Sequence, residues 1–339
     1  MKYNLLGNTG LKVSELCLGT MTFGGKGIWT AIGGADQQTV NELVRKSVDG
    51  GINFIDTANV YSEGISEEMT GKAIRNLGLK RDDLVIATKV RGKMSEGPNG
   101  SGLTRKHILH EVEASLKRLQ IDYIDLYQIH GFDALTPIEE TIDVLDSLVK
   151  SGKVRYIGCS NLAAWHIMKA KAYSHYNRLS SFVSLQAYYT LAGRGLEREL
   201  IPVLKDQNMG LMVWSPLAGG LLSGKYTRKM EAEAGSRRTN YDFPFVDKER
   251  AFTIIEALEP IAKSKNCSVA QLSLAWLLHQ KAVTTIIIGA KKVDQLEDNL
   301  KSVNVTFTAD ELKKLDEISQ LPPEYPHWMF ARQGADRIK

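Results

Sequence analysis

Cysteine is scarce in this sequence. The 339 residues include 3 cysteines, which lie far apart and form no C-x-x-C pair: Cys17, Cys159 and Cys267. An odd number at such spacing does not suit a disulfide framework, so we expect a reducing compartment. Each thiol is more typical of a small core residue than of a nucleophile.

Long apolar runs are also missing. Polar residues interrupt every apolar run of the N-terminal stretch MKYNLLGNTGLKVSEL, which therefore lacks the h-region of a signal peptide. No stretch approaches the roughly 18 apolar residues of a membrane-spanning helix. We predict a cytoplasmic protein without a membrane partner.

Proline is rare and the charges nearly balance. The chain has 9 prolines, 43% hydrophobic and 24% charged residues, which is typical of a globular protein. A net charge of +4 is compatible with an anionic small-molecule ligand but far from the balance of a nucleic-acid-binding protein. The 7 histidines include no H-x-x-x-H or H-E-x-x-H pattern, so we predict no metal site and no nucleic-acid partner.

The usual nucleotide motifs are incomplete. No G-x-G-x-x-G follows a predicted strand, which argues against a Rossmann domain. The stretch GGLLSGKY at 219–226 matches the spacing of a P-loop, but Tyr226 stands where Ser or Thr would bind magnesium. We interpret this stretch as a loop that binds a dinucleotide.

What the sequence does contain is a repeated alternation of short apolar strands and amphipathic helices. Helical periodicity is clear at Val40, Leu43, Val44 and Val48, for example. Strands that are apolar on both faces and joined by helices indicate a parallel sheet. We expect eight of them, at 17–23, 53–58, 84–90, 123–130, 154–161, 181–188, 210–217 and 284–290. Without a linker to divide the chain, this pattern predicts one domain over 1–339, an α/β fold of the (β/α)8 TIM barrel type.

Further segments surround the predicted barrel. We expect an N-terminal hairpin with its turn at GNTG and extra helices at 249–265 and 309–319. Reciprocal capping boxes are expected to start helices at TPIE (Thr136 as the cap, with Glu139), SVAQ and TADE. Inserts at 24–36 and 218–248 follow strand ends on the face where barrel enzymes build their sites. The tail 321–339 is expected to pack over a surface or at the pocket mouth.

Polar residues end three neighbouring strands. Asp56, Lys89 and His130 each end a row that alternation directs toward the barrel axis, and Tyr61 follows in the next loop. Taken singly, each suits a hydrated ion pair or a polar cap at a barrel rim. Together at the ends of adjacent strands they predict a catalytic site.

These residues also carry a family resemblance. Over nearly its whole length the chain resembles the aldo-keto reductase superfamily, most specifically at GINFIDTANVYSEG, IDLYQIH, GCSN and SPLAGGLLSGKY. The resemblance places the four catalytic positions on Asp56, Tyr61, Lys89 and His130. It implies an enzyme, an NAD(P)H-dependent oxidoreductase that interconverts an aldehyde or ketone and an alcohol.

The chemistry agrees with that assignment. No side chain supplies a hydride, so a nicotinamide cofactor is implied. Tyr61 is the expected proton donor, because a nearby cation such as Lys89 lowers the pKa of a phenol. Asp56 would hold Lys89, and His130 would either orient the substrate oxygen or relay a proton.

The resemblance also assigns a cofactor site. Ser160, Asn161 and Gln186 would bind the nicotinamide carboxamide, and Trp214 would stack on the ring. Many family members have arginine where this chain has Gln295, so the expected preference for NADP(H) depends on Lys291 and Lys292, and NAD(H) is not excluded. The full predicted set is Gly19, Thr20, Met21, Asp56, Ser160, Asn161, Gln186 and Trp214, then Ser215, Leu217, Gly219, Leu221 and Lys225 along the path of the pyrophosphate, and Gly289, Lys291, Gln295 and Asn299 at the adenosine end.

Two alternatives stay open at this point. The chain can instead be a regulatory NADP-binding subunit of the potassium-channel β type with weak turnover. It can also be a lyase that uses Lys89 as a Schiff base, which requires Lys89 to be desolvated rather than paired with Asp56. The partner is a small carbonyl or alcohol, in a pocket expected from Met21, Phe23, Trp29, Tyr61, the insert at 218–248 and Trp328. Substrate, direction and oligomeric state are not predicted.

Overall fold

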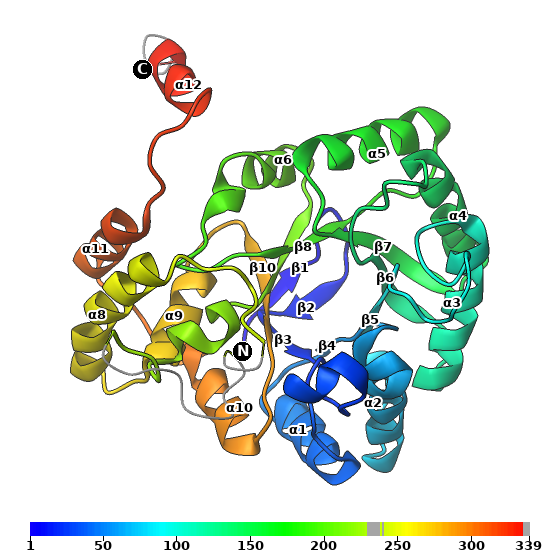
Figure 1. The fold of residues 1–339 in the computed structure, drawn as a ribbon, viewed down its shortest axis with the longest axis horizontal. Helices are drawn as coiled ribbons and strands as arrows, with labels where there is room; N and C mark the ends of the chain where they lie inside the picture. The colour runs from blue at the N-terminus through cyan, green and yellow to red at the C-terminus, as the bar shows by residue number, and fades with distance from the viewer. Residues whose placement is uncertain (229–237, 239–240, 335–339) are drawn as a thin grey trace.

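The barrel is the central feature of the computed structural model, which describes residues 1–228, 238 and 241–334. Within these residues eight parallel strands close on themselves in the order β10-β3-β4-β5-β6-β7-β8-β9 (Figure 1). The predicted (β/α)8 TIM barrel is confirmed. The strands are β3 (Leu16–Gly19), β4 (Phe54–Asp56), β5 (Val85–Val90), β6 (Ile124–Ile129), β7 (Val154–Ser160), β8 (Ser184–Tyr188), β9 (Gly210–Trp214) and β10 (Val283–Ile288).

Helices connect successive strands and cover the outside of the barrel (Figure 1). The covering helices are α1 (Gln37–Asp49), α2 (Ile65–Asn76), α3 (Arg105–Leu119), α4 (Ile138–Lys150), α5 (Ala164–Asn177), α6 (Leu200–Asp206), α9 (Val269–Leu278) and α10 (Val293–Leu300). The apolar residues that predicted α1 are buried, as Val40, Leu43 and Val44 show. The two expected extra helices are α8 (Lys248–Ser264) and α11 (Ala309–Ser319), which pack against each other.

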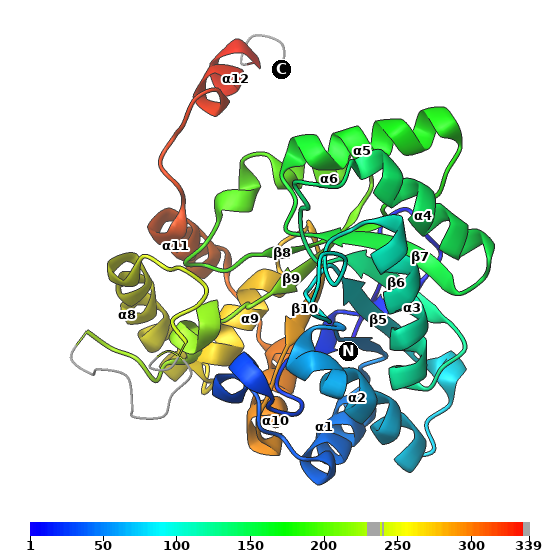
Figure 2. The same cartoon turned by 45° about the vertical axis from the view of Figure 1, so that its right-hand side comes forward.

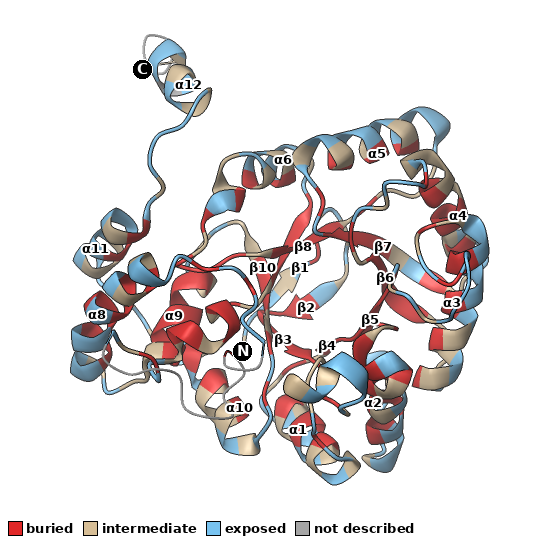
Figure 3. Cartoon of the chain, in the orientation of Figure 1, coloured by how far each residue is buried: buried red, intermediate tan, exposed pale blue. Residues whose placement is uncertain are grey.

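Side-chain alternation divides the core into two clusters. One lies between the strands and the helices, and Figure 3 shows how completely the strands are buried. A smaller inner cluster contains Phe54, Val85, Ala87 and Leu126, as expected for rows that face the axis. Ile124 lies two positions before Leu126, so alternation would also direct it toward the axis, but it packs with the outer cluster instead.

The N-terminal hairpin closes the end of the barrel where the strands begin. Strands β1 (Tyr3–Leu5) and β2 (Lys12–Ser14) pair antiparallel, as predicted. Leu6 and Val13 enter the inner cluster. The backbone N–H of Ile286 donates to the Glu15 carbonyl at 3.0 Å, which ties the hairpin to the start of the barrel wall.

The predicted helix caps have mixed outcomes. Thr308 and Glu311 form the expected reciprocal capping box at the start of α11. At α9 only half of the expected box forms: the Ser268 side chain accepts from the Gln271 N–H, whereas Gln271 Nε2 donates to Asp298 Oδ1 at 2.6 Å. The expected cap at Thr136 is wrong, because its hydroxyl donates to Asp133 Oδ2 at 2.7 Å and Pro137 takes the cap position of α4.

The two inserts and the tail lie outside this repeating pattern. The first insert contains a short 3₁₀ helix, η1 (Gly27–Ala31), and the second begins with η5 (Ala218–Ser223). Of the remaining second insert, residues 229–237 and 239–240 lie outside the described residues. In the tail, α12 (His327–Gly334) stands away from the barrel in both views (Figures 1 and 2), so its described part, Trp328 included, does not cover the strand ends.

Candidate active site

The site begins with an ion pair at the ends of two adjacent strands. Parallel register sets Asp56 of β4 opposite Ala87 of β5, which places Lys89 one inward step beyond it. Lys89 Nζ lies 2.6 Å from Asp56 Oδ2, and their side chains are 0% and 2% exposed. A pair so deeply buried is not the hydrated rim pair that either residue alone suggested.

Three acceptors surround the Lys89 ammonium. Besides Asp56, it donates to the Thr57 carbonyl at 2.7 Å and to the Tyr61 hydroxyl at 3.5 Å. Burial alone would lower the pKa of Lys89, but Asp56 and Tyr61 outweigh it and the pKa is raised. Lys89 is therefore a charged, paired lysine, which removes the condition that the Schiff-base alternative needed.

The second oxygen of Asp56 is held from the other side of the barrel. Asp56 Oδ1 accepts from Gln128 Nε2 at 2.9 Å and from Gln186 Nε2 at 3.0 Å. Both oxygens of this buried carboxylate are thus satisfied, as a buried charge requires. The sequence reasoning did not assign Gln128 to the site, although its signal was present: a polar residue in the inward row, two positions before His130.

Tyr61 begins a short 3₁₀ turn, η2 (Tyr61–Gly64), directly beyond β4. Its ring is 8% exposed and meets two other rings edge-on. The Trp29 ring centroid lies 5.2 Å away at 64°, and that of His130 lies 5.7 Å away at 76°. The first insert and the end of β6 therefore frame the phenol.

His130 is held in its neutral form. Burial, followed by the Lys89 and Arg91 cations, lowers the pKa of His130 to about 3. Its carbonyl accepts from Asn161 Nδ2 at 3.2 Å. Near neutral pH this imidazole carries one ring N–H, which suits it to a hydrogen bond with a substrate oxygen.

At the ends of β7, β8 and β9, several predicted cofactor residues are connected to this ion pair through Gln186. The Asn161 N–H and the Ser160 hydroxyl both donate to the Gln186 carbonyl, at 3.1 and 3.0 Å. Trp214 Nε1 donates to Asn161 Oδ1 at 3.0 Å. Since the Gln186 side chain also donates to Asp56, these residues form one connected hydrogen-bond network.

Trp214 has two aromatic neighbours that the sequence reasoning did not identify. Its ring centroid lies 5.1 Å from that of Tyr188 and 5.7 Å from that of Phe243, the latter almost parallel at 6°. Tyr188 follows Gln186 along β8 by two positions. Phe243 lies within the second insert, where no periodic pattern indicates spatial position.

Two glycines of the predicted cofactor set, Gly19 and Gly289, lie close together. Gly19 pairs with Asp56, and the Gly19 carbonyl is the one atom within 4 Å of a Cβ added to Gly289, at 3.8 Å. Such open backbone permits close approach of a ligand. Thr20 is directed elsewhere, because its hydroxyl lies 2.8 Å from the Ser66 hydroxyl of α2. Met21 is half-buried.

The loop after β9 turns through several left-handed residues. Ser215, Gly219 and Gly220 have φ of 50°, 66° and 94°, and the Gly219 N–H donates to Ser215 Oγ at 2.9 Å. No atom lies within 4 Å of a Cβ added to Gly220, and such open backbone permits close approach of a ligand. Leu217 is half-buried, Leu221 is buried and Lys225 is exposed.

The far end of the predicted path lies at the start of α10. Gln295 Oε1 accepts from the Lys291 N–H at 3.0 Å, and Asn299 is buried one turn later. Taken together, these features fit a nicotinamide dinucleotide. Side-chain amides suit its carboxamide, the indole ring suits its planar ring, and lysines lie near open backbone.

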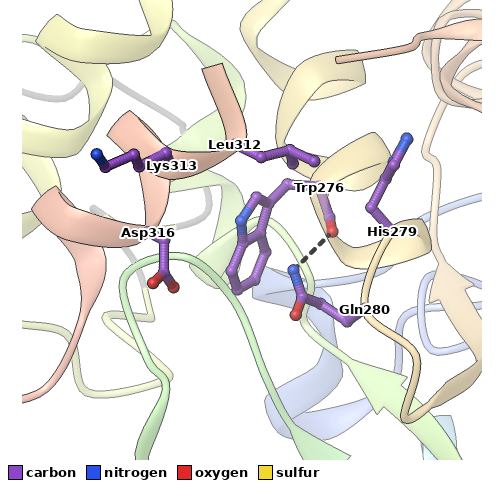
Figure 4. Close-up of a pocket in the computed structure, with 6 residues that line it drawn as sticks. All are labelled: Trp276, His279, Gln280, Leu312, Lys313 and Asp316. Carbon is purple, nitrogen blue, oxygen red and sulfur yellow. Dashed lines mark hydrogen bonds between the residues drawn. The ribbon is translucent and has the colours of Figure 1, made fainter. Parts of the chain in front are cut away.

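Other features are separate from this network. A pocket of about 270 Å³ lies between α9 and α11, and Figure 4 shows its lining: Trp276, His279, Gln280, Leu312, Lys313 and Asp316. None of these is a predicted site residue. In the described part of the chain, His, Cys, Asp and Glu form no group of three placed to hold a metal ion. No described helix has the length and apolar character to cross a membrane.

Comparison with known proteins agrees with this geometry. Residues 15–320 match the aldo/keto reductase family. The chain is 38% identical over 340 residues to an uncharacterized oxidoreductase, YrpG, of Bacillus subtilis, covering 97% of this chain and 100% of the relative. A putative aryl-alcohol dehydrogenase of Schizosaccharomyces pombe is 37% identical, with 93% and 95% covered. A probable voltage-gated potassium channel subunit beta of Arabidopsis thaliana is 36% identical, with 96% and 98% covered.

Proposed function

Because this chain belongs to the aldo/keto reductase family, we propose that it is a nicotinamide-dependent enzyme that interconverts an aldehyde or ketone and the corresponding alcohol. The observation that carries the proposal is the buried Lys89 ammonium, held 2.6 Å from Asp56 and 3.5 Å from the Tyr61 hydroxyl. A cation kept beside a phenol at the mouth of a barrel is arranged for proton transfer.

A nicotinamide held by the predicted cofactor residues would supply the hydride that a carbonyl carbon needs for reduction. The Tyr61 hydroxyl donates its proton to the carbonyl oxygen, which becomes the hydroxyl of the product alcohol. Lys89 stabilises the negative charge left on Tyr61, and Asp56 fixes Lys89 in place. The neutral His130 donates a hydrogen bond to the same oxygen and orients it, so orienting the substrate is the role we favour over proton relay.

The ring neighbours of Tyr61 suggest the substrate class. Trp29 and His130 both meet the Tyr61 ring edge-on, which presents aromatic surface around the reacting oxygen. One relative is named as a putative aryl-alcohol dehydrogenase. We therefore propose an aryl or other ring-bearing carbonyl.

For the cofactor we propose NADP(H) over NAD(H). Lys291 and Lys292 precede α10 and can face a 2′-phosphate, whereas Gln295 offers an amide that already accepts from the Lys291 backbone. An amide supplies no charge, so the preference depends on the two lysines. A cytoplasmic location stays a prediction from the three dispersed cysteines.

A second candidate function is supported by one of the relatives. The probable potassium channel subunit beta is 36% identical across 96% of this chain. On this hypothesis the chain binds cofactor, turns over slowly and acts through a partner. The ion pair would then be retained with little catalytic use.

A substrate panel separates the two candidates. Purified protein is titrated with NADPH and with NADH by fluorescence, and then assayed by NADPH absorbance with benzaldehyde, a substituted benzaldehyde and a short aliphatic aldehyde. The enzyme proposal expects multiple turnovers, faster with the aryl aldehydes. Tight binding without turnover across the panel would favour the channel-subunit candidate.

A further inference from the structure

The turn that carries Tyr61 has an unusual backbone. Ser62 has φ 49° and ψ 35°, Glu63 has φ 56° and ψ 40°, and Gly64 has φ 96°. Consecutive left-handed residues with side chains are strained, and such turns persist where surrounding contacts determine them. The position of the Tyr61 hydroxyl therefore depends on what holds this turn.

A buried polar cluster lies behind the turn, formed by Glu67 of α2 with Glu111 and Arg118 of α3. Arg118 Nε donates to Glu67 Oε2 at 2.6 Å, and its Nη2 lies 3.4 Å from Glu111 Oε2. The side chains of Glu67, Glu111 and Arg118 are 0%, 3% and 17% exposed. The planar guanidinium is what allows one side chain to bind two carboxylates at once.

The cluster touches the turn at both ends. Ahead of Tyr61, Asn59 Nδ2 donates to Glu111 Oε2 at 3.0 Å. Behind it, the Gly64 backbone rests on Arg118, because a Cβ added to Gly64 would lie 2.7 Å from Arg118 Cδ. The segment between these contacts contains Tyr61 and the left-handed residues.

The same cluster also reaches the strand of Lys89. Thr88 Oγ1 donates to Glu67 Oε1 at 2.5 Å, and Thr88 directly precedes Lys89 in β5. Burial raises the pKa of Glu67 in spite of Arg118 and Thr88, so the charge on this carboxyl depends on Arg118. One arginine thus connects the phenol and the cation that the site holds 3.5 Å apart.

We propose that Arg118, through Glu67 and Glu111, is a positioning residue that sets the distance between the Tyr61 hydroxyl and the Lys89 ammonium. This inference rests on the proposed function. In the described structure the contacts of the Arg118 guanidinium are with Glu67, Glu111 and Ser115, so its effect on proton transfer is indirect.

Arg118→Lys tests the proposal, because it keeps the charge and removes the planar fork. We expect kcat for benzaldehyde reduction to fall about tenfold or more, with KM and the NADPH Kd within about twofold of wild type, since removing an interaction used in the transition state lowers kcat. The matched control is Arg81→Lys, a partly buried arginine paired with Asp125 at the start of β5 and β6. It should keep kcat within about twofold.

A second readout does not depend on turnover. In protein labelled with [¹³Cζ]tyrosine, the Tyr61 resonance is identified by its loss in Tyr61→Phe. It should shift in Arg118→Lys, and also in Asn59→Ser, which removes the contact to Glu111, but not in Arg81→Lys. If Arg118→Lys does not fold, Asn59→Ser decides by the same two readouts.

Two results would overturn the proposal: a Tyr61 resonance that stays in place in the folded variants, or an equal loss of kcat in Arg118→Lys and Arg81→Lys. Failure of the proposed function gives a different result from both. In that case the wild-type protein reduces no carbonyl, and the Tyr61 resonance still reports whether Arg118 positions the phenol.

Discussion

The Asp56–Lys89 pair shows how the site is built at the scale of single residues. A lysine with no exposed side-chain surface would lose its charge unless a carboxylate lay beside it. The carboxylate in turn is bound by two glutamine amides from β6 and β8. Each charge in the site is therefore held by hydrogen bonds from other parts of the barrel wall.

Removal of one member of this pair should be costly. Asp56→Asn leaves the buried Lys89 without its counter-charge, and we expect the free energy of unfolding to fall by about 3–5 kcal/mol. Urea unfolding near neutral pH measures it. The double variant Asp56→Asn/Lys89→Met should recover most of this stability while staying inactive, and a single variant as stable as wild type would contradict the account.

The depressed pKa of His130 makes a prediction about stability and pH. The unfolded chain protonates this imidazole below its ordinary pKa of 6.5, whereas the folded chain does so near 3. Between these values the unfolded state binds more protons, so the His130 contribution is complete above 6.5 and is lost as pH falls, at up to about 1.4 kcal/mol per pH unit.

His130→Gln should therefore flatten the fall of unfolding free energy with pH, measured by urea unfolding at several values below neutrality. His175→Gln, at an exposed position of α5, is the control and should keep the wild-type slope. Equal slopes in wild type and His130→Gln would show that the imidazole titrates normally in the folded protein.

At the scale of elements, the N-terminal hairpin acts as a plug for the barrel. Leu6 and Val13 pack with Phe54 in the inner cluster, at the end away from the candidate site. A site at the C-terminal ends of the strands and a plug at the opposite end separate chemistry from stability in this fold. The hairpin is short, so its contribution comes from these few buried side chains.

Two adjacent leucines of the hairpin offer a matched comparison. Leu6 is 0% exposed and Leu5 is 54% exposed. Leu6→Ala should lower the free energy of unfolding by about 2–5 kcal/mol because it leaves a cavity in the inner cluster. Leu5→Ala should change it by no more than about 0.5 kcal/mol. Similar values for both would mean that the hairpin is not a plug.

For the whole molecule, the barrel and the grouping of Asp56, Lys89 and His130 were predictable because both follow from local periodicity. The support behind Tyr61 was not, because Arg118 and Glu67 are 51 positions apart and no local pattern pairs them. The cap at Thr136 failed because Asp133, three positions earlier, competes for its hydroxyl. The tail has no periodic pattern that could indicate its direction.

The position of the tail can be tested directly. The described part meets the body at Arg198 and Glu199, through partly exposed pairs with Glu324 and His327. Exposed pairs stabilise little, so truncation after Gln320 should lower the free energy of unfolding by no more than about 1 kcal/mol and leave KM for benzaldehyde unchanged. A KM several times higher would show that the tail reaches the pocket mouth.

The central claim is that Tyr61 delivers the proton in a carbonyl reduction, and Tyr61→Phe tests it most directly. The measurement compares kcat for benzaldehyde reduction by NADPH in the variant and in wild type, with cofactor binding followed by fluorescence. The account predicts a fall in kcat of about 10²–10⁴ with an unchanged NADPH Kd, the usual range for loss of a general acid. A variant that retains kcat within about twofold of wild type would contradict it.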